Sequence, residues 1–169
     1  APGIRWAATA AVVALSLLAL RPHFTALPSE STSERELAAA LQAGLQSGDT
    51  VVATGLSLAG VEYALRHRRD VSIVAYPSEL AAHPGYLGDL AARPDALYRR
   101  ALEAEATALL DRLAARPDSR ALLVFAPSIT DAVLFEHLRR DPRLRHSRLL
   151  GEYRQARIDA ELALFELRF

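Results

Sequence analysis

The stretch GDTVVATGLS, residues 48–57, decides the fold of this chain. Its apolar centre, from Val51 to Ala53, has the composition of a short buried strand. Gly55 follows at once, and Leu58 begins an apolar stripe at helical spacing. The stretch therefore predicts a strand, a tight turn and a helix. Such a unit either holds a phosphate at the start of the helix or only builds a sheet.

Two further segments repeat the strand pattern. Residues 71–76 and 121–126 are nearly continuous apolar runs, and each is closed by a proline. Strands that are covered on both faces have this composition, as in parallel sheets. Apolar residues at helical spacing lie before the first strand and after each of the three strands. This order predicts right-handed βαβ units.

In the C-terminal residues, Ala163, Phe165, Leu167 and Phe169 alternate with Leu164, Glu166 and Arg168. Alternation is typical of a half-buried strand. We expect an edge strand that pairs antiparallel with a strand near residues 149–153, because the connection is too short for a crossover helix. The predicted fold class is a small Rossmann-like three-layer α/β domain. Its mainly parallel sheet has an antiparallel C-terminal edge strand, and one apolar transmembrane helix precedes the domain.

The N-terminal segment has no charge from Trp6 to Leu20, a run of 15 residues. Arg5 and Arg21 flank it, and Trp6 is suited to a membrane interface. We predict a transmembrane helix at residues 1–21, a Pro/Ser-rich linker at 22–32 and a soluble α/β domain at 33–169. A secretory signal peptide and a buried soluble helix are the alternatives.

Composition narrows the possible chemistry. The chain has 169 residues and a net charge of zero, which gives no sign of a nucleic-acid partner. It has neither cysteine nor lysine, so thiolate metal sites, cysteine nucleophiles, Walker lysines and Schiff-base lysines are excluded. The histidines are scattered without metal-ligand spacing, and we predict no metal and no cofactor.

The phosphate-binding interpretation of residues 48–57 depends on where acidic residues stand relative to the strand. Residues 53–57 resemble the last part of the phosphate loop of phosphoribosyltransferases. That family implies two acids at the end of the strand for the ribose hydroxyls, whereas Asp49 stands alone before the strand. A phosphoribosyltransferase-like enzyme is therefore the least favoured hypothesis. We expect Gly55 to serve a tight turn, by positive φ or by close helix–strand packing.

A ligand crevice is expected where the parallel strands end. Its candidate residues share small polar side chains or glycine at the ends of strands and the starts of helices: Thr54, Gly55, Ser57, Tyr76, Ser128 and Thr130. Ser128 and Asp131 are interpreted as a helix cap rather than as part of a catalytic triad.

The whole layout resembles the C-terminal end of bacterial polytopic membrane glycosyltransferases of the GT-C type, similar to dolichyl-phosphate-mannose–protein mannosyltransferases. The features that carry the resemblance are the apolar helix, the linker, the Gly48-Asp49 turn before a strand, Glu62-Tyr63 in the next helix and the closing strand 164–169. The resemblance implies a small extracytoplasmic domain at the bacterial inner (plasma) membrane.

The same resemblance implies a function. The enzyme would transfer a sugar from a polyprenyl-phosphate donor to an acceptor, and its catalytic acids lie in loops that this chain does not contain. No catalytic residue is therefore expected here. The partners would be the membrane, the rest of the polytopic enzyme and the donor and acceptor. The alternatives are a membrane-tethered Rossmann-like module that binds a ligand or a partner protein, and a purely structural domain.

Overall fold

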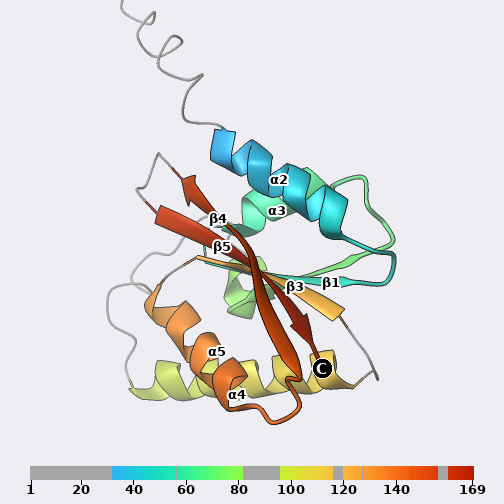
Figure 1. Cartoon of the computed structure of the whole chain (residues 1–169). Helices are drawn as coiled ribbons and strands as arrows, with labels where there is room; N and C mark the ends of the chain where they lie inside the picture. Colours follow the sequence, from blue (N-terminus) through green and yellow to red (C-terminus); the bar gives the residue numbers. More distant parts are fainter. Residues whose placement is uncertain (1–31, 56, 82–95, 116–119, 127, 156–159) are drawn as a thin grey trace, which may run out of the picture. The chain divides into compact units, whose positions relative to one another are not determined.

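Five strands form one sheet in the order β2-β1-β3-β5-β4 in the computed structural model, which describes residues 32–55, 57–81, 96–115, 120–126, 128–155 and 160–169 (Figure 1). The helical elements are α2 (Thr32–Gly44), α3 (Ser57–Leu65), the 3₁₀ helix η1 (Ser78–Ala81), α4 (Ala96–Ala114) and α5 (Ile129–Arg140). The strands are β1 (Thr50–Thr54), β2 (Ser72–Tyr76), β3 (Arg120–Phe125), β4 (His146–Gln155) and β5 (Ala160–Arg168).

Strand direction follows from the connections. β1 pairs parallel with β2 and with β3, and a helix crosses over between each successive pair in the chain. β5 pairs antiparallel with both β3 and β4, so four strands run one way and β5 runs the other. The expected antiparallel pairing of the C-terminal strand with the segment near residues 149–153 is confirmed.

Two apolar cores lie on opposite faces of the sheet because successive side chains of a strand point to opposite faces. On one face, α2 and α3 pack against Val51 and Ala53 of β1. On the other face, α4 and α5 pack against Val52 of β1 and Leu123 of β3. Figure 1 shows the two helix pairs on either side of the strands. Residues Ser33–Phe169 form one contact unit.

The predicted fold class is wrong in including a membrane-spanning helix. No helix in the described part of the chain is long and apolar enough to cross a membrane. The longest of the described helices, α4 with 19 residues, carries charged side chains such as Arg99, Glu103 and Asp111 along its length. The predicted transmembrane segment, residues 1–21, lies outside the described residues, as does the predicted linker up to residue 31.

The predicted position of the C-terminal strand is also wrong. β5 is an interior strand between β3 and β4, and β4 is the edge. Leu164 is fully buried on one face of β5, and Leu167 is 2% exposed on the other. The alternation was misleading because Glu166, which looks like an outward-facing residue, is itself only 5% exposed.

Candidate functional site

The predicted crevice forms where the parallel strands end. Thr54 of β1 is in register with Tyr76 of β2, and Ala53 with Val124 of β3, so these strands end at the same edge of the sheet. The turn from β1 into α3 brings Gly55 and Ser57 to this edge. The structure thus places Thr54, Gly55 and Ser57 close together, beside the start of α5.

The polar side chains at this edge bond to the protein itself. Thr54 Oγ1 donates to the Val124 carbonyl at 3.1 Å and accepts from the Ala126 amide at 2.9 Å, which joins β1 to the end of β3. Ser57 Oγ donates to the Thr54 carbonyl at 2.7 Å. Thr54 and Ser57 are 0% and 4% exposed. Their hydroxyl groups therefore fix the turn rather than face solvent.

Tyr76 is the last residue of β2, but its side chain points into the core beneath α4 and not toward the predicted crevice. Its hydroxyl donates to the Leu102 carbonyl of α4 at 3.1 Å, and the residue is fully buried in the core beneath α4 and α5. Burial is the main reason that the pKa of Tyr76 lies well above its usual range. The side chain therefore anchors α4 to β2.

Ser128 and Thr130 form the cap of α5. Ser128 Oγ accepts from the Asp131 amide at 3.3 Å, which confirms the predicted cap. The Ser128 and Thr130 hydroxyl groups lie 2.8 Å apart, and Thr130 Oγ1 donates to Asp131 Oδ1 at 3.4 Å. Thr130 is 2% exposed, so it too is part of the interior.

The burial of Asp131 was not predicted from the sequence. The residue is 0% exposed, and its Oδ2 atom has no hydrogen-bond partner among the residues that the structure describes. Burial raises the pKa of the Asp131 carboxyl to about 7, while the hydroxyl groups of Ser128, Thr54 and Thr130 act in the opposite direction. A carboxyl group with this pKa changes between its protonated and ionised forms near neutral pH. Only the helix-cap spacing drew attention to this residue in the sequence.

Gly55 closes the space beside Asp131. Its φ is +50°, and a Cβ atom there would lie 3.2 Å from Asp131 Oδ2 and 3.4 Å from the Ala126 Cβ. The expected positive φ is confirmed, and the close neighbours of this position are Asp131 and Ala126 rather than α3 packed on β1. The side chain of Asp131 therefore fits beneath the turn because Gly55 has none.

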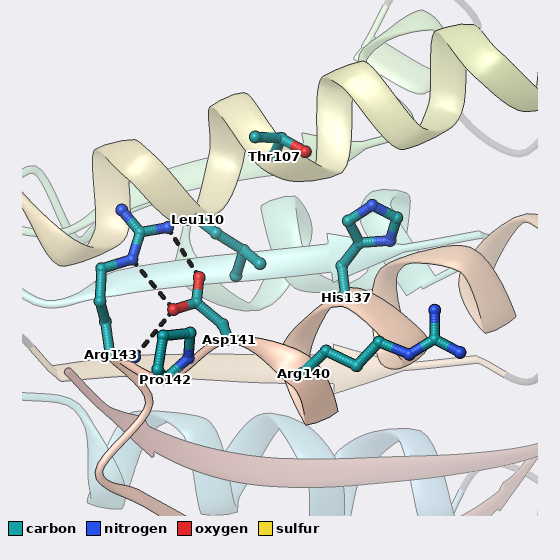
Figure 2. A pocket seen from close by; sticks show the side chains of 7 residues that line it. All are labelled: Thr107, Leu110, His137, Arg140, Asp141, Pro142 and Arg143. Atoms are coloured by element: carbon teal, nitrogen blue, oxygen red, sulfur yellow. Dashed lines mark hydrogen bonds and ion pairs between the residues drawn. The ribbon is translucent and has the colours of Figure 1, made fainter.

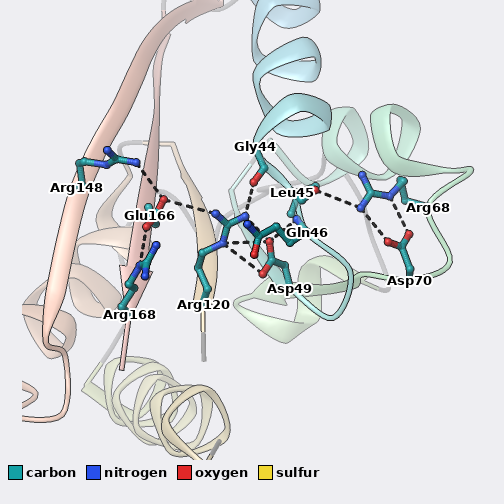
Figure 3. Close-up of polar contacts among 10 residues, drawn as sticks. All are labelled: Gly44, Leu45, Gln46, Asp49, Arg68, Asp70, Arg120, Arg148, Glu166 and Arg168. Carbon is teal, nitrogen blue, oxygen red and sulfur yellow. Dashed lines mark hydrogen bonds and ion pairs between the residues drawn. The ribbon is translucent and has the colours of Figure 1, made fainter. Parts of the chain in front are cut away.

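Asp49 directly precedes β1, at the amino ends of the parallel strands, and belongs to a cluster of acidic and arginine side chains (Figure 3). Arg120 Nη2 lies 2.5 Å from Asp49 Oδ2 and also donates to the Gly44 carbonyl at the end of α2. Arg120 Nη1 lies 3.7 Å from Glu166 Oε2. Asp49 is thus an ion-pair partner, distant from the turn at Gly55, and this arrangement counts against the phosphoribosyltransferase hypothesis.

Glu166 is the other acidic member of this cluster. Arg168 Nε donates to it at 2.8 Å and Arg148 Nη2 at 3.2 Å. The hydrogen bond from Arg168 is the main reason that the pKa of Glu166 lies below its usual range. The cluster therefore holds a charged carboxylate between the ends of β3, β4 and β5.

A cavity of about 400 Å³ lies between α4 and the end of α5 (Figure 2). Its lining residues come from α4, the last turn of α5 and the segment after it: Thr107, Leu110, His137, Arg140, Asp141, Pro142 and Arg143. None of them was predicted as a site residue. In the described segments, no group of three or more histidine, aspartate or glutamate side chains is placed to hold a metal ion.

Comparison with protein-family models, curated proteins and solved structures gives no match to this chain.

Proposed function

We propose that this chain is an accessory extracytoplasmic domain of a bacterial membrane glycosyltransferase that uses a polyprenyl-phosphate sugar donor. The order of elements from α2 onward supports the proposal. A helix, the Gly48-Asp49 turn, a strand, a helix with Glu62-Tyr63 and a closing strand follow one another as in the layout on which the resemblance rests.

The observation that carries the accessory role is the internal hydrogen bonding of the carboxyl edge. An α/β domain commonly binds its ligand where its parallel strands end. Here the hydroxyl groups of Thr54 and Ser57 donate to main-chain carbonyl groups of the same domain. This favours a domain that acts through its outer surface, as part of a larger enzyme, over one that performs chemistry at this edge.

The proposed partners are the membrane, the rest of the polytopic enzyme, the sugar donor and the acceptor. The domain would stand on the extracytoplasmic side of the inner (plasma) membrane and help to hold the acceptor near the catalytic part. Ligand binding in the predicted crevice itself stays a prediction, and the alternative of a ligand- or partner-binding module depends on it.

Immunodepletion tests the proposal. Membranes of the source cells are solubilised in mild detergent and depleted with antibodies against this chain, with pre-immune antibodies as the control. We expect depletion to remove transfer from at least one of a panel of polyprenyl-phosphate sugars and to leave nucleotide-sugar transfer unchanged. The purified chain alone should show no transfer. Full polyprenyl-phosphate-dependent transfer in the depleted extract would contradict the proposal.

A further inference from the structure

The cavity between α4 and the end of α5 has the size of a small-molecule site. Its volume of about 400 Å³ lies within the usual range for ligand pockets. In Figure 2 the His137 ring rises from α5 toward α4, and Leu110 and Thr107 face it from α4. The cavity thus has walls from two helices and from the turn that follows α5.

Arg143 and Asp141 form a fixed wall of this cavity. Arg143 donates to both oxygens of Asp141, at 2.9 Å from Nε and 2.7 Å from Nη2, and to Asp111 on α4 at 2.7 Å. These hydrogen bonds are the main reason that the pKa of Asp141 lies below its usual range. Because this guanidinium already donates to two carboxylates, Arg143 is part of the wall and is not the group that attracts a ligand.

His137 has one ring nitrogen committed and one available. Nδ1 lies 2.9 Å from the Val133 carbonyl oxygen. A carbonyl oxygen can only accept, so Nδ1 carries a proton and Nε2 is the atom left for a ligand. Nε2 accepts from a hydroxyl group when the ring is neutral and donates to an anionic oxygen when the ring is charged.

Arg140 is the uncommitted cation of the cavity. It follows His137 by three residues, which places both on one side of α5. Its guanidinium makes no hydrogen bond or ion pair with the part of the chain that the structure describes, unlike that of Arg143. A free guanidinium beside a cavity is suited to a phosphate group, which it can bind through two parallel N–H groups.

The remaining lining adds a hydroxyl group and apolar surface. Thr107 Oγ1 donates to the Glu103 carbonyl at 2.9 Å, which leaves its oxygen able to accept from a ligand hydroxyl. Leu110 and Pro142 supply apolar contacts. One free cation, two hydroxyl-accepting atoms and an apolar wall together fit a ligand that is anionic at one end and hydroxylated at the other.

We propose that this cavity is a binding site for a sugar phosphate. Arg140 binds the phosphate, while His137 Nε2 and Thr107 Oγ1 accept from sugar hydroxyl groups, and the C–H face of the ring lies against Leu110 and Pro142. The choice of a sugar as the hydroxylated part rests on the proposed function. The phosphate is either that of a free sugar phosphate or the head group of a lipid-linked one.

Calorimetric titration of the whole chain tests the site. The probes are mannose 1-phosphate, glucose 1-phosphate and galactose 1-phosphate, with inorganic phosphate and mannose as the separate halves. We expect at least one sugar phosphate to bind about tenfold more tightly than either half, because both sets of contacts then act together. A second arm adds vesicles with and without polyprenyl-phosphate mannose and asks whether the lipid-linked sugar competes with the free one.

Matched variants locate the binding. Arg140→Gln should weaken sugar-phosphate binding about tenfold or more, since hydrogen bonds to a charged group are lost. His137→Gln should weaken it by a smaller factor. Arg139→Gln makes the same charge change one residue earlier, outside the lining of this cavity, and should change affinity less than about twofold, because an exposed charge that does not contact the ligand is screened by solvent and salt.

Two results would overturn the site. One is a lack of saturation by any sugar phosphate up to about 10 mM, the weakest affinity at which such contacts would still matter. The other is equal weakening by Arg139→Gln and Arg140→Gln. Neither result bears on immunodepletion, which reports which polypeptide carries the transfer activity, so the two proposals fail separately.

Discussion

Asp131 has an unusual environment for a carboxyl group. It is buried under Gly55, its Oδ2 atom has no hydrogen bond within the described part of the chain, and its pKa is raised to about 7. The folded protein therefore holds a proton here at pH values at which the unfolded chain, with a pKa of 3.8, has released it. Consequently this residue makes stability fall as pH rises between these two pKa values, and has no further effect above the higher one.

The variant Asp131→Asn should remove that dependence. In the wild type, this carboxyl should make the free energy of unfolding roughly 2–3 kcal/mol lower at about pH 8 than at pH 5. Asparagine cannot ionise, so the variant should not show this difference. Chemical denaturation of both proteins at the two pH values measures this as a double difference, in which the histidines cancel. An identical pH profile for the two proteins would show that Asp131 is ionised in the folded state.

Gly55 should be sensitive to the smallest side chain. Its φ of +50° is unfavourable for alanine, and the new Cβ would press on Asp131 Oδ2. We expect Gly55→Ala to lower the free energy of unfolding by about 1–3 kcal/mol.

Gly60 is the control for this substitution. It lies within α3, and a Cβ atom there would meet nothing within 4 Å. Gly60→Ala should raise the free energy of unfolding by roughly 0.5–1 kcal/mol, because alanine loses less backbone entropy in a helix. If both substitutions raise stability in urea denaturation, the turn at Gly55 does not have the backbone conformation described.

Arg120 joins elements rather than acting alone. Its guanidinium bonds to Asp49 before β1 and to the Gly44 carbonyl at the end of α2, and it approaches Glu166 of β5. Arg120→Met should lower the free energy of unfolding by roughly 2–4 kcal/mol, because it leaves nearly buried carboxylates with fewer partners.

Arg99→Met is the matched surface control for Arg120→Met. Arg99 pairs with Glu103 one turn along α4, and their side chains are 60% and 41% exposed. Its loss should change stability by less than about 0.5 kcal/mol, since exposed ion pairs contribute little. Equal effects of the two substitutions on denaturation would mean that the Arg120 cluster is solvated and stabilises no junction between elements.

The position of β5 inside the sheet predicts a pattern of amide exchange. Successive amides of an interior antiparallel strand point alternately to its two neighbours, so those of β5 bond to β3 and β4. We expect protection at consecutive positions of β5 from Ala163 to Arg168, where it pairs with both neighbours, and protection at only alternate positions of β4. Hydrogen exchange followed by NMR measures this. Rapid exchange at every second amide of β5 would place that strand at the edge instead.

The sequence predicted local units better than it predicted their neighbours. The strand before Gly55, the turn itself and the cap at Ser128 follow from short-range patterns, and the structure has all three. The interior position of β5 did not follow, because Glu166 looks solvent-exposed until the arginines that pair with it are known. Whether Asp131 is buried was equally hidden, since it depends on the distant turn at Gly55.

The sequence predicted where the crevice lies, but it did not predict that the hydroxyl groups there bond within the protein. Parallel strands do bring Thr54 and Gly55 to one edge beside the start of α5. A hydroxyl residue in sequence carries no information on whether its bond goes to a ligand or to a main-chain carbonyl, and here Thr54 and Ser57 do the latter. The cavity at His137 was missed because its lining residues come from α4 and α5, which are separated in sequence.

At the scale of the whole molecule, the described sheet and its two helix layers form a scaffold in which most of the named polar side chains at the two ends of the parallel strands bond within the domain, Asp131 Oδ2 being the exception. The carboxyl edge is closed by hydroxyl–carbonyl bonds, and the opposite edge by the Arg120 cluster. Such a scaffold leaves the cavity between α4 and α5 open at the surface of the domain. The proposed accessory role relies on surfaces of this kind.

The most direct measurement of that role uses the source cells with an in-frame deletion of the codons for residues 33–169. Membranes from deleted and parental cells are compared for sugar transfer from a panel of labelled polyprenyl-phosphate sugars to endogenous acceptors, with nucleotide-sugar transfer as the control. We predict that transfer from one polyprenyl-phosphate sugar falls at least about tenfold, equivalent to about 1.4 kcal/mol in activation free energy, and returns when the intact gene is restored. Unchanged transfer from every polyprenyl-phosphate sugar in the deleted cells would contradict the proposed function.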